Sequence, residues 1–264
     1  MVLSRDAAKD NWLLITMSDP LHPYGIAGLE ICMKSYLRTA VALLFSPYDG
    51  VKNLRLMPTK SLLVPMVLQI SLPLMMLYAY YQRVDILWLQ DQITASMDAH
   101  QQEVASRYMT RGFMITSAAL VLATLVPVIS ALLALYFFLV AKAQSAEETY
   151  GRWYMLVSWA AVPTLLLVPV GLAVIFLSSD GRLLPDEINP TTLNQLLVHA
   201  DGSNPWRSLL EGVNPFLFWP IALMAIGFSV WTRIPIGRAT LITAAPYTIV
   251  FGVWALLITL VSAG

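Results

Sequence analysis

The sequence predicts an all-α membrane protein with five transmembrane helices, an N-terminal amphipathic interfacial helix and helical outer loops. Of its 264 residues, 58% are hydrophobic and 12% are charged, whereas a soluble domain has about 45–50% apolar and about 25% charged residues. Five stretches without Asp, Glu, Lys, Arg or His contain 18 to 30 residues each, and a helix needs about 20 to cross the hydrocarbon core. The expected spans are residues 61–81, 112–141, 153–177, 215–232 and 239–261.

Residues 1–60 are expected to form a cytoplasmic N-terminal region that precedes the five-helix domain, residues 61–264. The only apolar run before residue 26, Trp12–Met17, is shorter than a signal-peptide core, so we expect no cleaved leader. Within residues 26–45, Glu30, Lys34 and Arg38 recur every four residues on an otherwise mostly apolar helix. This narrow polar stripe predicts a helix that lies in the membrane interface. The alternative is a short buried helix of a cytoplasmic domain.

A second short helix is expected directly before the first span. Pro47 follows Ser46, and proline is favoured at the first helical position while serine can cap the exposed N–H groups. The sequence therefore predicts a helix over Pro47–Met57 that leads through Pro58 into the membrane.

The two outer segments are expected to be helical. From residue 84 to residue 108, apolar residues recur at helical spacing without Pro or Gly, which predicts that spans one and two continue as a helical hairpin beyond the membrane. In the second outer segment, Asn-Pro occurs at residues 189–190 and 204–205, and again at 214–215. Each pair is typical of a helix start, so we expect helices at about Thr191–His199, Trp206–Glu211 and Pro215–Thr232.

Basic residues indicate the orientation. The N-terminal region and the two loops on its side contain 11 of the 16 Lys and Arg residues, and the opposite side contains five. Positive charge accumulates on the cytoplasmic side of membrane proteins. We therefore expect a multi-pass protein of the bacterial inner membrane with a cytoplasmic N-terminus and an outer C-terminus.

The five spans contain no ionisable side chain; their polar groups are Gln69 and scattered Ser and Thr. Every span contains proline, which we interpret as tolerated where neighbouring helices satisfy the freed carbonyls rather than as functional hinges. Ala244, Thr248 and Gly252 form a small-residue stripe for close helix contact, either within the bundle or with a partner. Aromatic residues near the span ends are expected to be interface anchors: Trp153, Trp219, Trp231, Trp254, Tyr78, Tyr80, Tyr81, Tyr150 and Tyr154.

The sequence contains little that indicates a catalytic site, a metal site or a nucleotide-binding site. No nucleotide-binding loop, serine-hydrolase elbow or zincin motif is present, and the single cysteine, Cys32, can form no internal disulfide. His100 and His199 with Asp98 or Asp201 are the nearest approach to a metal site, but they lack close ligand spacing. Lys and Arg balance Asp and Glu at 16 each, which argues against a nucleic-acid partner. We expect no catalytic residue, cofactor or metal.

From Pro47 to the C-terminus the chain resembles the Yip1 family of five-span membrane proteins. The motifs that carry the resemblance are Pro47-Tyr48-Asp49-Gly50-Val51, Asn214–Trp219, Ala225–Phe228, the basic turn Arg233–Arg238 and Ala245-Pro246-Tyr247. The resemblance implies a non-enzymatic protein: eukaryotic relatives act in Golgi vesicle traffic with small GTPases, and some bacterial relatives are accessory subunits of ABC-type exporters. The long outer segments 82–111 and 178–213 favour a partner outside the membrane.

Three functions follow from these observations. The first is an accessory protein that binds other membrane proteins, such as ABC exporter subunits and a periplasmic adaptor, with Trp206 on the outer surface as a contact. The second is a small transporter or channel lined by Ser, Thr, Gln69 and proline-freed carbonyls. The third is a membrane-shaping protein that binds lipids through residues 26–45. A continuous polar cavity would favour transport, and a dry bundle would favour a partner.

Overall fold

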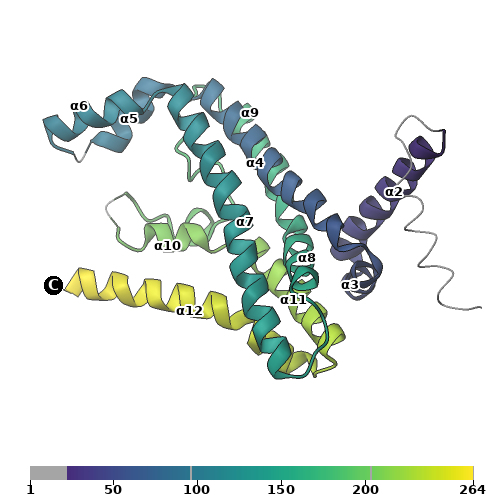
Figure 1. Ribbon diagram of the computed structural model, residues 1–264. Coiled ribbons are helices and arrows are strands. Elements are labelled where there is room, and N and C mark those ends of the chain that lie inside the picture. The colour runs from purple at the N-terminus through teal and green to yellow at the C-terminus, as the bar shows by residue number, and fades with distance from the viewer. Residues whose placement is uncertain (1–22, 96, 203, 264) are drawn as a thin grey trace, which may run out of the picture.

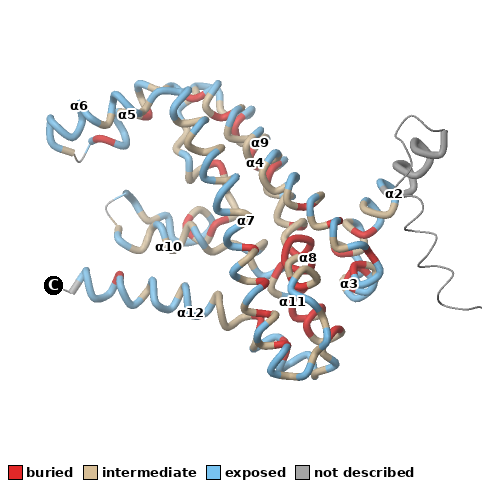
Figure 2. The backbone as a smooth tube through the Cα atoms, in the orientation of Figure 1, coloured by how far each residue is buried: buried red, intermediate tan, exposed pale blue. Residues whose placement is uncertain are grey.

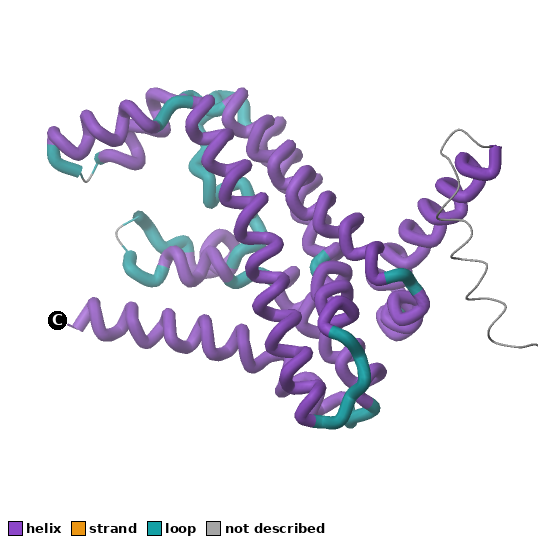
Figure 3. Tube along the Cα trace, viewed as in Figure 1, coloured by secondary structure: helices purple, strands orange, loops and turns teal. Residues whose placement is uncertain are grey.

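The computed structural model describes residues 23–95, 97–202 and 204–263. Throughout this part of the chain the regular structure is helical, without a strand (Figure 3). Five helices are long and apolar enough to cross a membrane. Their bounds are Thr59–Arg83, Arg111–Ala143, Tyr150–Leu177, Pro215–Thr232 and Ile236–Ser262. The all-α membrane fold is therefore confirmed.

Among the residues that the structure describes, two helices precede the spans. Helix α2 (Pro23–Phe45) and helix α3 (Pro47–Leu56) meet at Ser46. The predicted Pro47–Met57 helix forms, with proline at its first turn, but the Ser46 side chain caps no N–H group. Arg152 instead secures the C-terminal end of α3, since its guanidinium donates to the carbonyls of Arg55 and Met57 at 3.1 and 2.6 Å.

The spans are built from eight regular segments. Span one comprises η1 (Thr59–Leu62) and α4 (Leu63–Arg83), and span two is α7 (Arg111–Ala143). Span three is interrupted: α8 (Tyr150–Ala160) passes into a 3₁₀ turn, η2 (Val162–Leu166), and then α9 (Leu167–Leu177). Helices α11 (Pro215–Thr232) and α12 (Ile236–Ala263) form the last two spans. The outer segments add α5 (Ile86–Thr94), α6 (Ala99–Tyr108), η3 (Asn194–Val198) and α10 (Arg207–Gly212).

The helices splay outward from a packed centre (Figure 1). Helix α4 packs on α7 and α9, and α11 packs on α3, α8, η2 and α12. Helix α2 extends away from the bundle across the direction of α4, and α12 diverges from α7 toward the C-terminus, with α10 between them (Figure 1). Figure 2 shows buried residues concentrated around α8 and α11, whereas α5, α6 and the outer half of α12 are mostly exposed.

Aromatic residues form the centre of the core. Trp153 on α8 lies 5.1 Å from Phe228 and 5.2 Å from Trp231, both on α11, measured between ring centroids. Phe137 on α7 completes the cluster at 6.1 Å from Phe228. Trp153 and Trp231 are buried, so their prediction as interface anchors was wrong. Trp219 and Trp254, in contrast, are partly exposed at the helix surface.

The predicted continuous hairpin beyond spans one and two was also wrong. Helix α4 ends at Arg83, and the Asp85 carboxylate accepts hydrogen bonds from the N–H groups of Leu87 and Trp88 to start α5 anew. Asp98 and Gln101 form a capping box at the start of α6, and Thr110 caps α7. Three side-chain caps therefore break the segment into separate helices, because each offers the backbone an alternative to continuing the preceding helix.

The Asn-Pro pairs behave largely as predicted. Asn214 caps α11 by accepting from Leu217 N at 3.1 Å, and Asn204 accepts from Trp206 N at 2.9 Å just before α10. Asn189 accepts from Thr191 N, but the expected Thr191–His199 helix is shortened to the π-helical turn η3. His199 ends this turn in the left-handed region at φ 54°.

Candidate functional site

The second outer segment, residues 178–213, is hydrogen-bonded to the end of the first span and to the residues that follow it. It also exposes apolar side chains. The Tyr80 hydroxyl at the end of α4 donates to Leu183 O at 2.8 Å, and Asp85 N donates to Gly181 O at 2.9 Å. Gly181 has φ +67°, and a Cβ there would lie 2.6 Å from Arg83 O. The backbone at this point requires glycine, since other residues are strained in this region and would clash.

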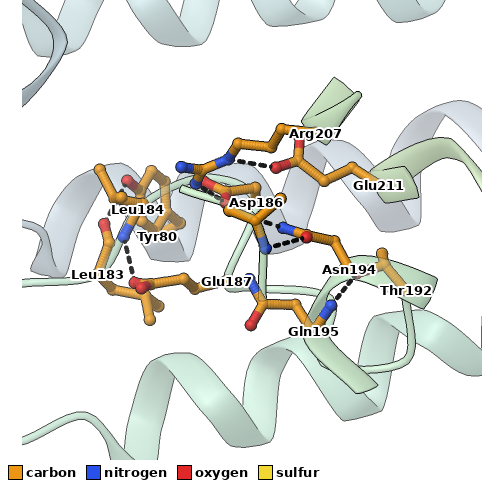
Figure 4. Close-up of polar contacts among 11 residues, drawn as sticks. Tyr80, Leu183, Leu184, Asp186, Glu187, Thr192, Asn194, Gln195, Arg207 and Glu211 are labelled. Carbon is orange, nitrogen blue, oxygen red and sulfur yellow. Dashed lines mark hydrogen bonds and ion pairs between the residues drawn. The ribbon is translucent and has the colours of Figure 1, made fainter. Parts of the chain in front are cut away.

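An ion-pair network closes the segment on itself (Figure 4). Arg207 on α10 pairs with Asp186 and donates from Nε to Glu211 Oε1 at 2.6 Å. Its hydrogen bonds to Glu211 and then to Asp186 raise the pKa of Arg207 above its ordinary value. Glu187 accepts from Leu184 N at 2.8 Å, so the neighbouring acids Asp186 and Glu187 hold the loop together rather than serving as an acid–base pair.

A short apolar run lies exposed on this fixed loop. Leu196, Leu197 and Val198 on η3 are 53%, 73% and 48% exposed. They lie between the third and fourth spans, outside the helices that cross the membrane. Contiguous exposed apolar side chains on an ordered surface are typical of a contact site for another protein or a membrane. We call Leu196, Leu197 and Val198 the outer apolar run.

The predicted partner-contact residues lie in two places. Trp206, half-buried, directly precedes α10 on the same outer loop as the outer apolar run. Ala244, Thr248 and Gly252 lie along α12, where Thr248 and Gly252 are exposed. No atom of a neighbouring element lies within 4 Å of the Cβ position at Gly252. Gly252 therefore makes no close helix contact with the residues that the structure describes.

Close helix approach depends on other glycines that the sequence analysis missed. A Cβ at Gly227 on α11 would lie 2.6 Å from the Leu156 side chain, and one at Gly171 on α9 would lie 2.4 Å from Met76 Sδ. At Gly50 on α3 it would lie 2.7 Å from Leu43 N. These glycines are isolated in the sequence, so a search for small residues at every fourth position does not find them.

The predicted membrane-interface residues lie on α2. Lys34 and Arg38 are exposed, whereas the Glu30 side chain lies outside the described residues. The face of α2 with Thr39 and Leu43 is buried against the bundle, and Trp219 Nε1 donates to Leu43 O at 3.3 Å. An exposed apolar stripe recurs every four residues beside the charges: Met33, Leu37, Val41 and Phe45.

Two polar side chains inside the spans donate hydrogen bonds to backbone carbonyls near a helix break or a proline. Gln69 Nε2 donates at 2.7 Å to Ser158 O, one of the last four carbonyls of α8 before the break at η2. The Tyr136 hydroxyl donates at 2.9 Å to Ile242 O, the carbonyl that Pro246 leaves without an N–H partner four residues later. The Tyr136 contact supports the structural interpretation of Pro246.

The described residues contain no group of three or more His, Cys, Asp or Glu side chains that could hold a metal ion. His100 and His199 therefore do not assemble with their neighbouring acids into a metal centre. Glu148, which follows Glu147 in the sequence, forms an ion pair with Arg55 of α3 at 2.8 Å. The ion pairs Arg55–Glu148 and Arg207–Asp186 thus connect separate parts of the chain.

Comparison with known families assigns the fold. The model of the Yip1 domain matches residues 41–257, from the end of α2 to the outer half of α12. The chain belongs to the Yip1 family. Neither a curated protein nor a solved structure matches the chain. The Yip1 domain thus includes α3, all five spans and both outer segments, while most of α2 lies ahead of it.

Proposed function

We propose that this Yip1-family protein is a non-enzymatic accessory subunit of the bacterial inner membrane that binds and modulates another membrane protein. The outer apolar run carries this proposal. Three consecutive apolar side chains are exposed on a loop that hydrogen bonds and ion pairs hold rigid. A fixed apolar surface loses little conformational freedom on binding, so it favours association.

The polar groups of the spans favour this role over transport. A carrier needs ionisable or coordinating groups at depth, but the spans lack ionisable side chains between their ends. Gln69 Nε2 and the Tyr136 hydroxyl are used by the backbone. These contacts stabilise a fixed bundle.

The partner we propose is an ABC-type efflux complex with its periplasmic adaptor. A cytoplasmic N-terminus, as the basic residues predict, places the outer apolar run and Trp206 on the periplasmic side. The stripe Ala244, Thr248 and Gly252 on α12 would then contact a helix of the exporter within the membrane. This arrangement uses one surface in water and one in the bilayer.

Co-purification in mild detergent tests the proposal. The wild-type protein should recover exporter and adaptor subunits in a fixed ratio, and Leu197→Gln should reduce that recovery about tenfold or more, as expected for a buried contact at an interface. Leu56→Gln is the matched control, because Leu56 is an exposed leucine on α3, outside the outer segments. Recovery of the protein alone, or equal losses in the two variants, would contradict the proposal.

A second function, binding to anionic membranes, is favoured by α2. Its exposed apolar stripe lies beside Lys34 and Arg38, the combination found in interfacial helices. Each basic residue near an anionic surface contributes about 1 kcal/mol. Reversing both charges to Glu should therefore weaken binding of detergent-purified protein to anionic vesicles by about tenfold or more. Arg107→Glu on α6 is the control, and unchanged binding by the double variant would exclude this role.

A further inference from the structure

A cavity of about 240 Å³ lies among the spans, where α4, α7, α8, α11 and α12 approach one another. Eight of its eleven lining residues are apolar: Leu125, Val126, Ile129, Leu133, Val157, Ala161, Pro220 and Met224. The remaining three are Gln69, Ser130 and Tyr247. A mostly apolar cavity with a few polar groups is typical of a small-molecule site.

The three polar residues retain unused hydrogen-bonding groups. Ser130 is 7% exposed, and its hydroxyl makes no hydrogen bond to any described residue. The Tyr247 hydroxyl makes none either, and Gln69 uses its amide nitrogen on Ser158 O while its amide oxygen accepts nothing. Other hydroxyls in the spans do bond to backbone, such as that of Ser117 to Met114 O at 3.0 Å. An unpaired polar group is costly where hydrocarbon surrounds it.

The cavity is accessible from the lipid side. Leu125 and Ile129 of its lining are 48% and 51% exposed on α7, in the middle of a helix that crosses the membrane. A molecule dissolved in the bilayer can therefore enter sideways. No charged side chain lines the cavity, so a phosphate or carboxylate there would lose its hydration without a cation to replace it.

We propose that this cavity binds an uncharged lipid that carries a hydroxyl group, with diacylglycerol as the representative. The apolar chain lies against the eight apolar residues, and the hydroxyl and ester groups pair with Ser130, Tyr247 and the Gln69 amide oxygen. Water alone would leave the apolar walls wetted, and a plain acyl chain would leave the three polar groups unpaired. A lipid with both parts satisfies the whole lining.

Photo-crosslinking of the full-length protein in lipid vesicles tests this proposal. A diacylglycerol with a diazirine on its acyl chain and a phosphatidylcholine with the same diazirine chain are each added in trace amounts. Diacylglycerol should label the peptides around residues 125–133 and 247 more strongly than phosphatidylcholine does. Ser130→Ala should lower this labelling about threefold, as expected for one hydrogen bond within a membrane, and Ser117→Ala should leave it unchanged.

A second pair of variants separates the cavity from the surrounding lipid. Ile129→Trp narrows the entrance and should abolish the diacylglycerol labelling, whereas Val128→Trp, at a neighbouring and similarly exposed residue outside the lining, should preserve it. Circular dichroism confirms that each variant is folded. Equal labelling by the two lipids, or labelling that survives Ile129→Trp, would show that only annular lipid is present and would overturn the proposal.

Discussion

Gly50 sets how closely α2 and α3 approach each other. A Cβ at this position would lie 2.7 Å from Leu43 N and 3.0 Å from Ala42 C. These are backbone atoms, so they cannot move aside as a flexible side chain does. Alanine ordinarily stabilises a helix by about 1 kcal/mol relative to glycine, but here the clash separates two helices.

We expect Gly50→Ala to lower the free energy of unfolding by about 1–3 kcal/mol, as overpacking does elsewhere. Gly252→Ala is the control, because its Cβ meets no neighbouring element, and this change should stabilise the protein slightly. Thermal unfolding in detergent, followed by circular dichroism, measures both. A Gly50→Ala protein as stable as the wild type would show that α2 does not pack as described.

At the scale of single residues, the sequence predicted the local role of a side chain better than its contacts with other helices. Asn214 was correctly predicted to cap α11, because a cap is a local arrangement. Trp153 and Trp231 were placed in the interface because they lie near span ends, yet they face α11 and α8 in the core. Position along a span indicates depth in the membrane, but the face of a uniformly apolar helix cannot be read from its sequence.

Among the elements, Pro246 inside α12 offers a sharp test of how proline is tolerated. Pro246 leaves Ile242 O without its helical partner, and the Tyr136 hydroxyl of α7 occupies that position. Tyr136→Phe should therefore lower the free energy of unfolding by about 0.6–2 kcal/mol. In the Pro246→Ala background the restored N–H satisfies Ile242 O, so the same change should cost nothing.

Tyr150→Phe is the matched control for this cycle, since Tyr150 donates to Ala131 O, a carbonyl inside the helical part of α7. It should have a smaller effect that does not depend on residue 246. The wild type, the Tyr136→Phe variant, the Pro246→Ala variant and the double variant are unfolded thermally in one detergent without guanidine. Their stabilities give the coupling energy between residues 136 and 246. An equal cost of Tyr136→Phe with and without Pro246 would contradict the proposed pairing.

The elements outside the membrane were only partly predictable. The helical spacing of residues 84–108 correctly indicated helix, but Asp85, Asp98 and Thr110 are N-cap residues that the periodicity analysis ignored. The capping box Asp98–Gln101 was a readable signal. The π-helical form of η3 was not, because its end at His199 depends on Asn194 accepting from Ala200 N and on contacts with α10.

For the whole molecule, we expect the odd number of spans to place the start of the first and the end of the fifth on opposite sides of the membrane. We expect residue 202 to be outside and residue 52 to be cytoplasmic. In a Cys32→Ala background, a membrane-impermeant maleimide should label Gly202→Cys in intact cells and Lys52→Cys only after lysis; both positions are exposed. The reverse pattern would invert the orientation and place the outer apolar run in the cytoplasm.

The cavity and the outer apolar run illustrate what only the assembled molecule reveals. Ser130 and Tyr247 lie on different helices more than a hundred residues apart, and no sequence pattern links them. Leu196, Leu197 and Val198 lie within the helix predicted at about Thr191–His199, but that prediction did not indicate that all three are exposed. Burial depends on tertiary contacts that helical spacing does not determine.

Site-specific photo-crosslinking in living cells tests the central claim most directly. A benzophenone amino acid at position 197 should yield one discrete crosslinked species that contains an exporter or adaptor subunit, whereas the same probe at position 56 should not. If position 197 yields only lipid adducts or crosslinks no more than position 56 does, the outer surface is not a docking site for a protein partner.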